Sequence, residues 1–412
     1  MQALVEKYER KLVDHGLAQA QATLIGGLDA EFVWNRQDPR CSILEQIAAG
    51  LNINSLLLAR PREPYFSIIN NLCRSQDTLL PNDCETRTFL HEIPVVPALE
   101  PQAVIAALKR RKSVIIPTEG VMSYGTVSPE QAFVTFSSVC FAAFVKLFLD
   151  YYLLIKAGKQ NHELRELVRS AGTAYGTTLA EAQRHTPDLQ GPFAHRVAAI
   201  QAMIEAGNAT VQARMVDSYF GNISYRLADT IMISQTASSM DELAGCIDAC
   251  PLDGSSCVGL TASSEYPAHR LILSSGQYGT LLHGHPKFSV IRSMMCDEID
   301  CPGEGSCHLT CHKTRSIKDT PIVPGEVGAG KYGLCNTVPA AIADSGKAIV
   351  YGHGVFAAGK SDFRAPFQIL LEVERACWND YFVKTGQTDL VESATDGRGG
   401  PALSLKNTHP RS

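Results

Sequence analysis

The 412-residue sequence predicts an α/β protein of two parts. Short β-branched runs alternate with helical patterns along the whole chain, which is the pattern of a mixed α/β fold. The composition, 45% hydrophobic and 19% charged, is that of an ordinary globular chain, and the length fits two domains or one domain with a large extension. In addition, two strand–turn–helix units of the first half reappear in the second half in the same order.

The N-terminal part, residues 1 to about 135, has mixed α/β patterning. The run "SVIIP" at 113–117 predicts a strand, because β-branched residues lie between turn signals. A helix is expected from about 128 to 160, with Ser128 as cap and Pro129 in the first turn. This helix contains the longest apolar stretch, but Lys146 and Asp150 interrupt it, which favours a buried amphipathic helix over a membrane span.

The C-terminal part follows a helical segment and the linker "TPDLQGP" at 186–192. Its patterns predict two short strands joined as a hairpin, a strand that carries two histidines, a later strand, and helices between and after them. The expected strands cover 222–227, 230–234, 279–285 and 347–359, and the expected helices cover 193–216, 263–276, 286–295 and 365–382.

This internal sequence repeat indicates a duplication, and the alternative is a chance similarity of two strand–helix units. "SLLLARPREPYFSIINNLC" at 55–73 resembles "TLLHGHPKFSVIRSMMC", and "RKSVIIPTEGVMSYGTVSPEQAF" at 111–133 resembles "GKAIVYGHGVFAAGKSDFRAPF". Aligning the phenylalanines that follow the first pair of strands sets Pro61 and Glu63 opposite His283 and His285, and Glu119 falls opposite His353. The first copy then lacks the histidines and is expected to be a structural, non-catalytic partner domain.

Three histidines form a candidate metal site. His283 and His285 are two apart in a predicted strand and therefore point to the same face. A metal needs at least a third ligand, and His353 at the end of another predicted strand offers one. Three neutral imidazoles suit Zn²⁺ and, less selectively, Mn²⁺, Co²⁺ or Fe²⁺. The alternative is a surface pair of histidines with an unrelated loop histidine.

Four motifs in this order resemble the class II aldolase/adducin family, which includes fuculose-phosphate aldolase, over residues 192 to about 385. They are "GNISYRLADTIMISQT", "SSEYPAH", "LLHGHPKF" and "YGHGVFAAG". The resemblance implies a three-layer α/β/α sandwich with a mostly antiparallel central sheet, preceded here by a smaller α/β domain that we interpret as a degenerate copy. The expected organisation is a degenerate aldolase-like domain at 1–152, a helical connector and linker at 153–191, a catalytic domain at 192–392 and a flexible tail at 393–412.

The resemblance also implies roles for individual residues. His283, His285 and His353 match the zinc ligands, and Glu265 matches the catalytic acidic residue beside the metal. Another set matches positions that hold the substrate's phosphate: Gly221, Asn222, Thr236, Ser263 and Ser264. Local structure offers alternatives: Glu265 as a helix N-terminal acid, the serines as plain helix caps, and Asn222 and Thr236 as turn residues.

The expected function is that of a metal-dependent lyase of the aldolase or decarboxylase type in carbohydrate metabolism. Its substrate would be a small hydroxy-carbonyl compound, a sugar phosphate or a hydroxy acid, and the reaction would pass through a zinc-stabilised enediolate. An epimerase or dehydratase at the same site, and an adducin-like assembly protein without catalysis, are the alternatives. Two departures matter: the segment about twenty residues beyond the histidine pair lacks the family's tyrosine, and Ala237 stands where the family often has glycine.

The thirteen cysteines are spread unevenly, and a polar segment holds Cys296, Cys301, Cys307 and Cys311 together with two histidines. A second metal or an iron–sulfur cluster is one interpretation of this segment. Disulfides under oxidation and unliganded thiols are the others, because the spacing fits no standard ligand pattern.

The net charge and the N-terminal segment limit which partners and which cellular location are expected. The net charge is −5 and there is no strongly basic block, so neither nucleic acid nor an anionic membrane is expected as a partner. The N-terminal segment is charged and helix-patterned rather than a signal peptide, which predicts a cytoplasmic protein. The family resemblance adds the expectation of a homo-oligomer, a dimer or tetramer, that acts on a small molecule.

Overall fold

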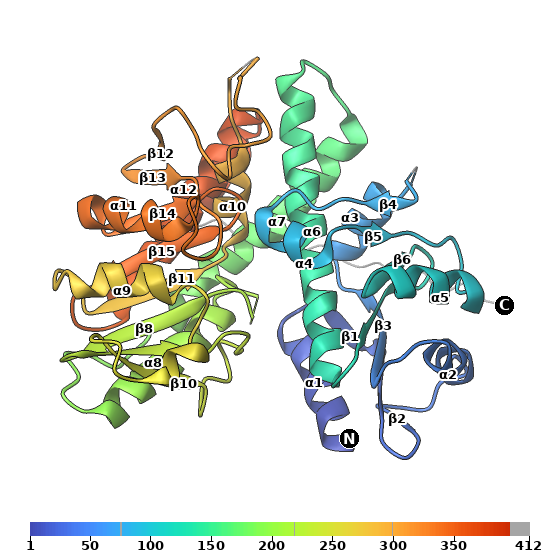
Figure 1. The fold of residues 1–412 in the computed structure, drawn as a ribbon. Helices are drawn as coiled ribbons and strands as arrows, with labels where there is room; N and C mark the ends of the chain where they lie inside the picture. The colour runs from blue at the N-terminus through green and yellow to red at the C-terminus, as the bar shows by residue number, and fades with distance from the viewer. Residues whose placement is uncertain (75, 218, 299, 396–412) are drawn as a thin grey trace.

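The computed structural model describes residues 1–395 apart from 75, 218 and 299, and it shows two α/β parts, each built on its own sheet (Figure 1). The predicted tail at 393–412 lies outside the described residues except for 393–395, which end helix α13 (Thr388–Thr395). The connector contains α7 (His162–Glu181) and a short 3₁₀ helix (Ala182–His185).

The N-terminal sheet has five strands in the order β2-β1-β3-β7-β6, and every neighbouring pair is antiparallel. Successive residues of a strand face opposite sides, so Leu57 packs into one core while Leu56 and Leu58 pack into another. The first core takes residues of α1, α3 and α6, and the second takes residues of α2 and α5. The elements are α1 (Gln2–Asp14), β1 (Ala18–Leu28), β2 (Phe32–Trp34), α2 (Cys41–Ala49), β3 (Ser55–Pro61), α3 (Tyr65–Leu72), α5 (Pro101–Arg110), β6 (Ser113–Ile116), β7 (Gly120–Gly125) and α6 (Pro129–Lys156).

The C-terminal sheet has eight strands in the order β10-β9-β8-β11-β15-β14-β13-β12, and only the β13–β14 pair is parallel within this sheet as described. Helices α8, α10 and α12 cover one face, while α9 and α11 cover the other. The predicted three-layer sandwich with a mostly antiparallel sheet is therefore confirmed. The elements are α8 (Arg196–Gln212), β8 (Asn222–Leu227), β9 (Thr230–Ser234), β10 (Ile247–Pro251), α9 (Tyr266–Ser274), β11 (Thr280–Gly284), α10 (Lys287–Met294), β12 (Arg315–Ile317), β13 (Thr320–Val323), α11 (Val338–Ser345), β14 (Lys347–Val350), β15 (Gly354–Gly359) and α12 (Arg364–Lys384).

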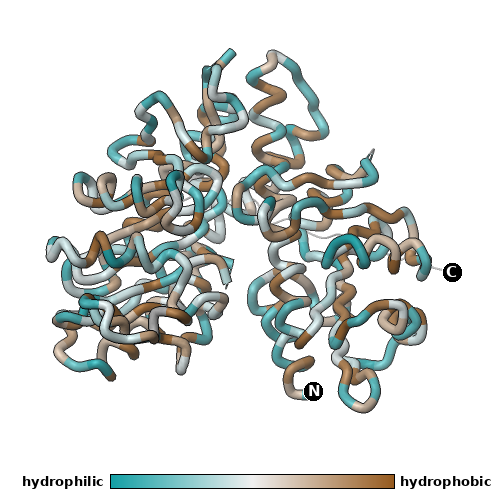
Figure 2. Tube along the Cα trace, viewed as in Figure 1, coloured by the Kyte–Doolittle hydropathy of each residue, from teal (hydrophilic) through white to brown (hydrophobic). Residues whose placement is uncertain are grey.

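Helix α6 lies between the two parts and joins their cores. It is long and apolar enough to pass a membrane-span test on length and composition, but 89% of its apolar window is buried inside the protein. Its Phe148 ring lies 4.9 Å from the ring of Phe288 in α10 (centroid to centroid), which links the two domains. Figure 2 shows hydrophobic residues along this helix and along the strands. The prediction of a buried helix at this position is confirmed.

The two domains share one topology. The central C-terminal strands run β9-β8-β11-β15-β14, which repeats the N-terminal order β2-β1-β3-β7-β6 with the same antiparallel pairings. The helices before, between and after these strands also occur in the same order. Two matched units in the sequence thus extend to a matched set of strands and helices, which supports the interpretation of a degenerate copy.

The strand register corrects one detail of the predicted alignment. Ser55 pairs with Gly125 in the first sheet as Thr280 pairs with Gly359 in the second. Counting along the strands from these pairs, Leu58 and Arg60 stand in the places of His283 and His285, so the prediction of Pro61 and Glu63 is wrong. The reason is an insertion of three residues: β3 ends at Pro61 and α3 begins at Tyr65, whereas α10 begins directly after Pro286.

A second correction concerns the predicted strand at 347–359. It is a hairpin, β14 and β15, because the glycine-rich "YGHG" forms a tight turn with Gly352 in the left-handed region, at φ 58°. His353 therefore lies in a turn rather than at a strand end. The alignment of Glu119 with His353 still holds, since Gly120 pairs with Ile116 as Gly354 pairs with Val350.

Candidate metal centre and substrate cavity

The three histidines come together at one end of the C-terminal sheet. His283 lies in β11, His285 follows one residue after the strand ends, and His353 occupies the turn before β15. β11 and β15 are antiparallel neighbours, which brings the two segments side by side. The exposed fractions of the three residues are 0%, 2% and 3%, so the alternative of a surface histidine pair is excluded.

The ring nitrogens converge on one point. The Nε2 atom of His283 lies 2.9 Å from that of His285 and 3.2 Å from that of His353. Tetrahedral Zn–N bonds of 2.0–2.1 Å would place two nitrogens roughly 3.4 Å apart, close to these separations. Glu265 adds an oxygen, with Oε1 at 2.7 Å from Nε2 of His353 and Oε2 at 3.5 Å from Nε2 of His283. Three nitrogens and one carboxylate therefore fit a divalent transition metal.

Contacts on the far side of the rings fix two of the three histidines. Nδ1 of His283 is 2.9 Å from the carbonyl oxygen of Val355, which directs its Nε2 into the centre. Nδ1 of His353 is 3.2 Å from Oε2 of Glu85, a residue of the N-terminal domain. Nδ1 of His285 is buried and has no hydrogen-bond partner among the described residues.

Burial and close carboxylates separate the pKa values of the histidines. Burial lowers the pKa of His283 to about 4 and holds that of His285 well below its usual value. Burial also disfavours protonated His353, but its hydrogen bonds to the Glu265 and Glu85 carboxylates outweigh this and raise its pKa to about 10. Two of the three rings are therefore neutral near pH 7, as metal ligation requires.

Glu265 is placed by its helix and by Asn222. It occupies the N-cap position of α9 but makes no capping hydrogen bond with its side chain, so the alternative of a simple helix-cap acid is not what its contacts show. The amide of Asn222 donates to Oε2 at 2.7 Å. Burial opposes ionisation of Glu265, yet the electrostatic interaction with the His283 ring and the hydrogen bonds from His353 and Asn222 outweigh it and hold the pKa of the carboxyl well below its usual range.

A cavity of about 460 Å³ opens onto this centre between the two domains. The cavity is lined by Glu265 and His285 and by all five residues predicted to bind the substrate: Gly221, Asn222, Thr236, Ser263 and Ser264. The hydroxyl of Ser263 also accepts the backbone N–H of Glu265 at 3.3 Å, so its helix-capping alternative holds in part. Ala237 lines the same cavity at φ 57°, a left-handed conformation that suits the glycine often found there in the family.

The opposite wall belongs to the N-terminal domain and was missed by sequence reasoning. It includes Glu85 and Phe89 of a short helix α4 (Cys84–Leu90), Lys112, and a stretch of α6 that begins at Glu130. Tyr219 completes this side and donates a hydrogen bond from its hydroxyl to Glu130. No motif marks these residues, and only the packing of the two domains reveals them.

The cysteine-rich segment does not form a comparable cluster. Among the described residues, groups of three or more histidine, cysteine, aspartate or glutamate residues with ligand atoms within 4.8 Å of one another include the three histidines but no cysteine. All thirteen cysteines are free thiols, and no disulfide joins them. The segment thus lacks a preformed site for the predicted second metal or cluster at Cys296, Cys301, Cys307 and Cys311.

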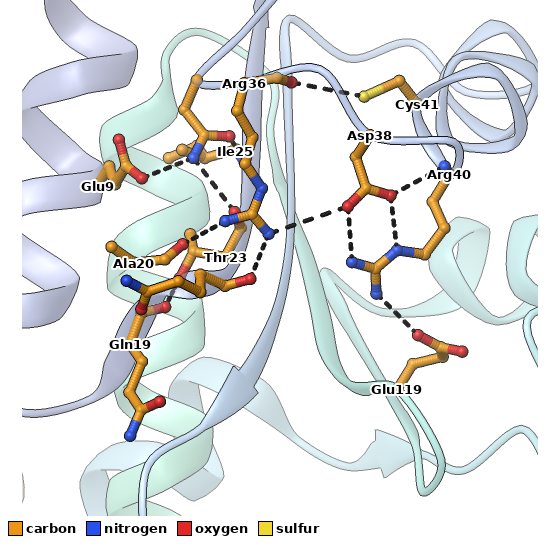
Figure 3. A network of polar contacts seen from close by, with 12 residues as sticks. Glu9, Gln19, Ala20, Thr23, Ile25, Arg36, Asp38, Arg40, Cys41 and Glu119 are labelled. Carbon is orange, nitrogen blue, oxygen red and sulfur yellow. Dashed lines mark hydrogen bonds and ion pairs between the residues drawn. The ribbon is translucent and has the colours of Figure 1, made fainter. Parts of the chain in front are cut away.

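The equivalent place in the N-terminal domain is filled by ion pairs (Figure 3). Arg40 stands at the N-cap of α2 as Glu265 stands at the N-cap of α9, and Glu119 takes the place of His353. An arginine nitrogen of Arg40 lies 3.0 Å from Oε2 of Glu119, and Asp38 binds the other side of the same guanidinium. The acidic and basic partners are exchanged between the two places, and Leu58, Arg60 and Glu119 stand where the C-terminal domain has its three histidines.

Together, the sandwich and its buried histidine–carboxylate centre define the class of this domain. Residues 201–379 match the family model described as the class II aldolase and adducin N-terminal domain, and the C-terminal domain of this chain belongs to the class II aldolase/adducin family.

Solved structures with a related fold include several aldolases. An L-fuculose-1-phosphate aldolase from Thermus thermophilus is 20% identical, with 50% of this chain and 100% of that chain covered at a TM-score of 0.36. YgbL from Klebsiella pneumoniae, described as a putative aldolase/epimerase/decarboxylase, is 18% identical, with 43% and 86% covered and a TM-score of 0.35. A sugar-phosphate aldolase from Thermotoga maritima is 16% identical, with 50% and 99% covered and a TM-score of 0.34.

No curated protein matches the chain. Because these TM-scores and identities are low, the family assignment rests on the family model and on the residues of the centre.

Proposed function

We propose that this protein is a metal-dependent lyase of the aldolase or decarboxylase type that acts on a small hydroxy-carbonyl substrate through an enediolate. The observation that carries the proposal is the convergence of three Nε2 atoms and the Glu265 carboxylate beside a cavity of substrate-sized volume. Zn²⁺ suits this ligand set, and Mn²⁺, Co²⁺ and Fe²⁺ are further candidates.

In this proposal His283, His285 and His353 hold the metal, which when bound supplies a Lewis acid that stabilises negative charge on substrate oxygens. Glu265 moves a proton at its carboxylate. Its lowered pKa leaves Glu265 as a carboxylate near pH 7, which is the protonation state from which a general base acts. Asn222 holds that carboxylate in place through its 2.7 Å hydrogen bond.

Ser264, just before α9, and Thr236 line the cavity, and hydroxyl groups with the free backbone N–H groups at a helix start give this end hydrogen-bond donors for an anionic group. This end suits the phosphate of a sugar phosphate or the carboxylate of a hydroxy acid. An epimerase or dehydratase would use the same residues, and product identity separates these reactions. The buried centre argues against an adducin-like assembly protein, because a scaffold has no need of converging metal ligands. The cytoplasmic location, the role in carbohydrate metabolism and the homo-oligomeric state stay predictions.

A substrate screen tests the proposal. Phosphorylated ketoses and hydroxy acids are incubated with the protein loaded with Zn²⁺, Mn²⁺ or Co²⁺, and products are identified by mass spectrometry. We expect carbon–carbon bond cleavage of at least one compound, lost in His283→Ala and at least a hundredfold slower in Glu265→Gln. Cleavage at the wild-type rate in His283→Ala would contradict the proposal.

A further inference from the structure

The N-terminal domain reaches the metal centre through one side chain. Glu85, in the first turn of α4, places Oε2 at 3.2 Å from Nδ1 of His353. The side chain of His353 is 4% exposed and that of Glu85 is 28% exposed, so the contact lies at the edge of the cavity, shielded from bulk water on the histidine side. It joins a residue of one domain to a predicted metal ligand of the other.

Local structure holds Glu85 in this position. Asp83 caps α4 and is fully buried, accepting the backbone N–H of Thr86 at 2.8 Å. The backbone N–H of Cys84 donates to the carbonyl oxygen of Gly352 at 2.8 Å, which docks the first turn of the helix on the residue next to His353. The helix therefore starts on the turn that carries the histidine.

Helix α4 has no counterpart in the repeated topology. In the N-terminal domain it lies between β4 (Thr78–Leu79) and β5 (Ile93–Pro94), whereas the C-terminal domain has the cysteine-rich segment and β12–β13 between the equivalent helices α10 and α11. The N-terminal domain thus carries an added helix, and the first turn of that helix contacts the metal centre of the C-terminal domain.

Metal-binding histidines generally donate their second ring N–H to a carboxylate or a carbonyl oxygen, which fixes the tautomer and the ring orientation. His283 has the Val355 carbonyl for this purpose, and His353 has Glu85. With Nδ1–H donated to Glu85, Nε2 is the ring atom of His353 that would exchange its proton for a metal, and it faces the other two histidines.

We propose that Glu85 is a positioning residue for the metal ligand His353, so that the N-terminal domain completes the metal centre of the C-terminal domain. The proposal rests on the metal-dependent function proposed above. Loss of this carboxylate would leave the His353 ring without its orienting acceptor and weaken metal binding without removing any ligand.

The test compares full-length, metal-stripped variants by chelator competition for Zn²⁺ and by the visible spectrum of bound Co²⁺. In Glu85→Ala we expect Zn²⁺ affinity to fall about 10- to 100-fold and the Co²⁺ bands to shift. Glu85→Gln keeps an acceptor oxygen and should recover most of the affinity. Glu6→Ala removes an exposed carboxylate from the same domain and should bind like the wild type.

Wild-type affinity and an unchanged Co²⁺ spectrum in Glu85→Ala would overturn the positioning role while leaving the proposed function intact. A second outcome would also overturn the positioning role. It is a loss of Zn²⁺ affinity in Glu85→Ala with an unchanged Co²⁺ spectrum and a lower melting temperature of the metal-free protein, because a contact that only stabilises the fold would give that pattern. If the wild type binds neither metal, the proposed function fails, and the Glu85 role fails with it.

Discussion

Gly354, directly after His353, is the position where the fold allows least room at the metal centre. A Cβ atom there would lie 2.4 Å from the carbonyl oxygen of Gly284, 2.9 Å from Cε1 of His283 and 3.0 Å from Cδ2 of His285. Relieving the contact with Gly284 requires β11 and β15 to separate by about 1 Å, and such overpacking costs about 1–3 kcal/mol of unfolding free energy. Metal–ligand distances tolerate only about 0.2 Å, so Gly354→Ala should also lower Zn²⁺ affinity at least roughly tenfold.

The duplicated topology supplies a matched control for this variant. Gly120 stands at the equivalent position, and its Cβ would lie 2.3 Å from the carbonyl oxygen of Ala59, with the added strain of φ 122°. Gly120→Ala should therefore lose at least as much stability, yet keep its Zn²⁺ affinity because no histidine lies beside it. Gly330→Ala points into open space and should change neither quantity.

Urea unfolding of the metal-free proteins measures the stability, and competition with a chromophoric chelator measures the affinity. Wild-type affinity in Gly354→Ala, or an equal loss of affinity in Gly120→Ala, would refute the reasoning.

Three further predictions follow from the same contacts. Burial raises the pKa of the Asp83 carboxyl to about 6. Since this exceeds the unfolded value, the folded state loses stability as the pH rises from about 4 through 6. Asp83→Asn keeps the cap and removes this loss, so its stability relative to wild type should rise by up to about 3 kcal/mol between pH 4 and pH 7 in urea titrations. A stability difference between Asp83→Asn and the wild type that does not change with pH would contradict this prediction. Lys287 is nearly buried and pairs with Asp217 at 3.2 Å, so Lys287→Met should cost about 3 kcal/mol by leaving that carboxylate unpaired, and adding Asp217→Asn should recover part of the loss. Zn²⁺ at one hundred times its dissociation constant should raise the unfolding free energy by about 2.7 kcal/mol in the wild type and by none in His283→Ala, as read from thermal melts with and without chelator.

Local sequence patterns were sufficient for the part of the centre that depends on neighbouring residues. The apolar run before His283, the following proline and the helix α10 are adjacent in the chain, so strand, turn and helix could be predicted together. The same holds for Glu265, because "SSEYP" has the features of a helix start. The position of His353 was harder to predict from the sequence, since one glycine-rich stretch is compatible with a continuous strand or with a hairpin.

The other wall of the cavity could not be predicted, because it depends on how two domains pack. Helix α4, "CETRTFL", has no periodicity or motif that connects Glu85 with a histidine 268 positions later in the sequence. The strand register of the first copy depends on backbone pairing, and a three-residue insertion shifted the alignment of side chains. In the cysteine-rich segment the sequence suggested more than the structure contains. Its residue types suit a metal, but their sulfur atoms do not converge.

The central claim is that His283, His285 and His353 bind one metal ion. Metal analysis of the purified protein by plasma mass spectrometry, beside His283→Ala prepared in the same way, tests it most directly. We predict about one equivalent of a divalent transition metal per chain in the wild type, with Zn²⁺ favoured, and its loss in the variant. Less than about half an equivalent in the wild type, or the same content in both proteins, would contradict the claim.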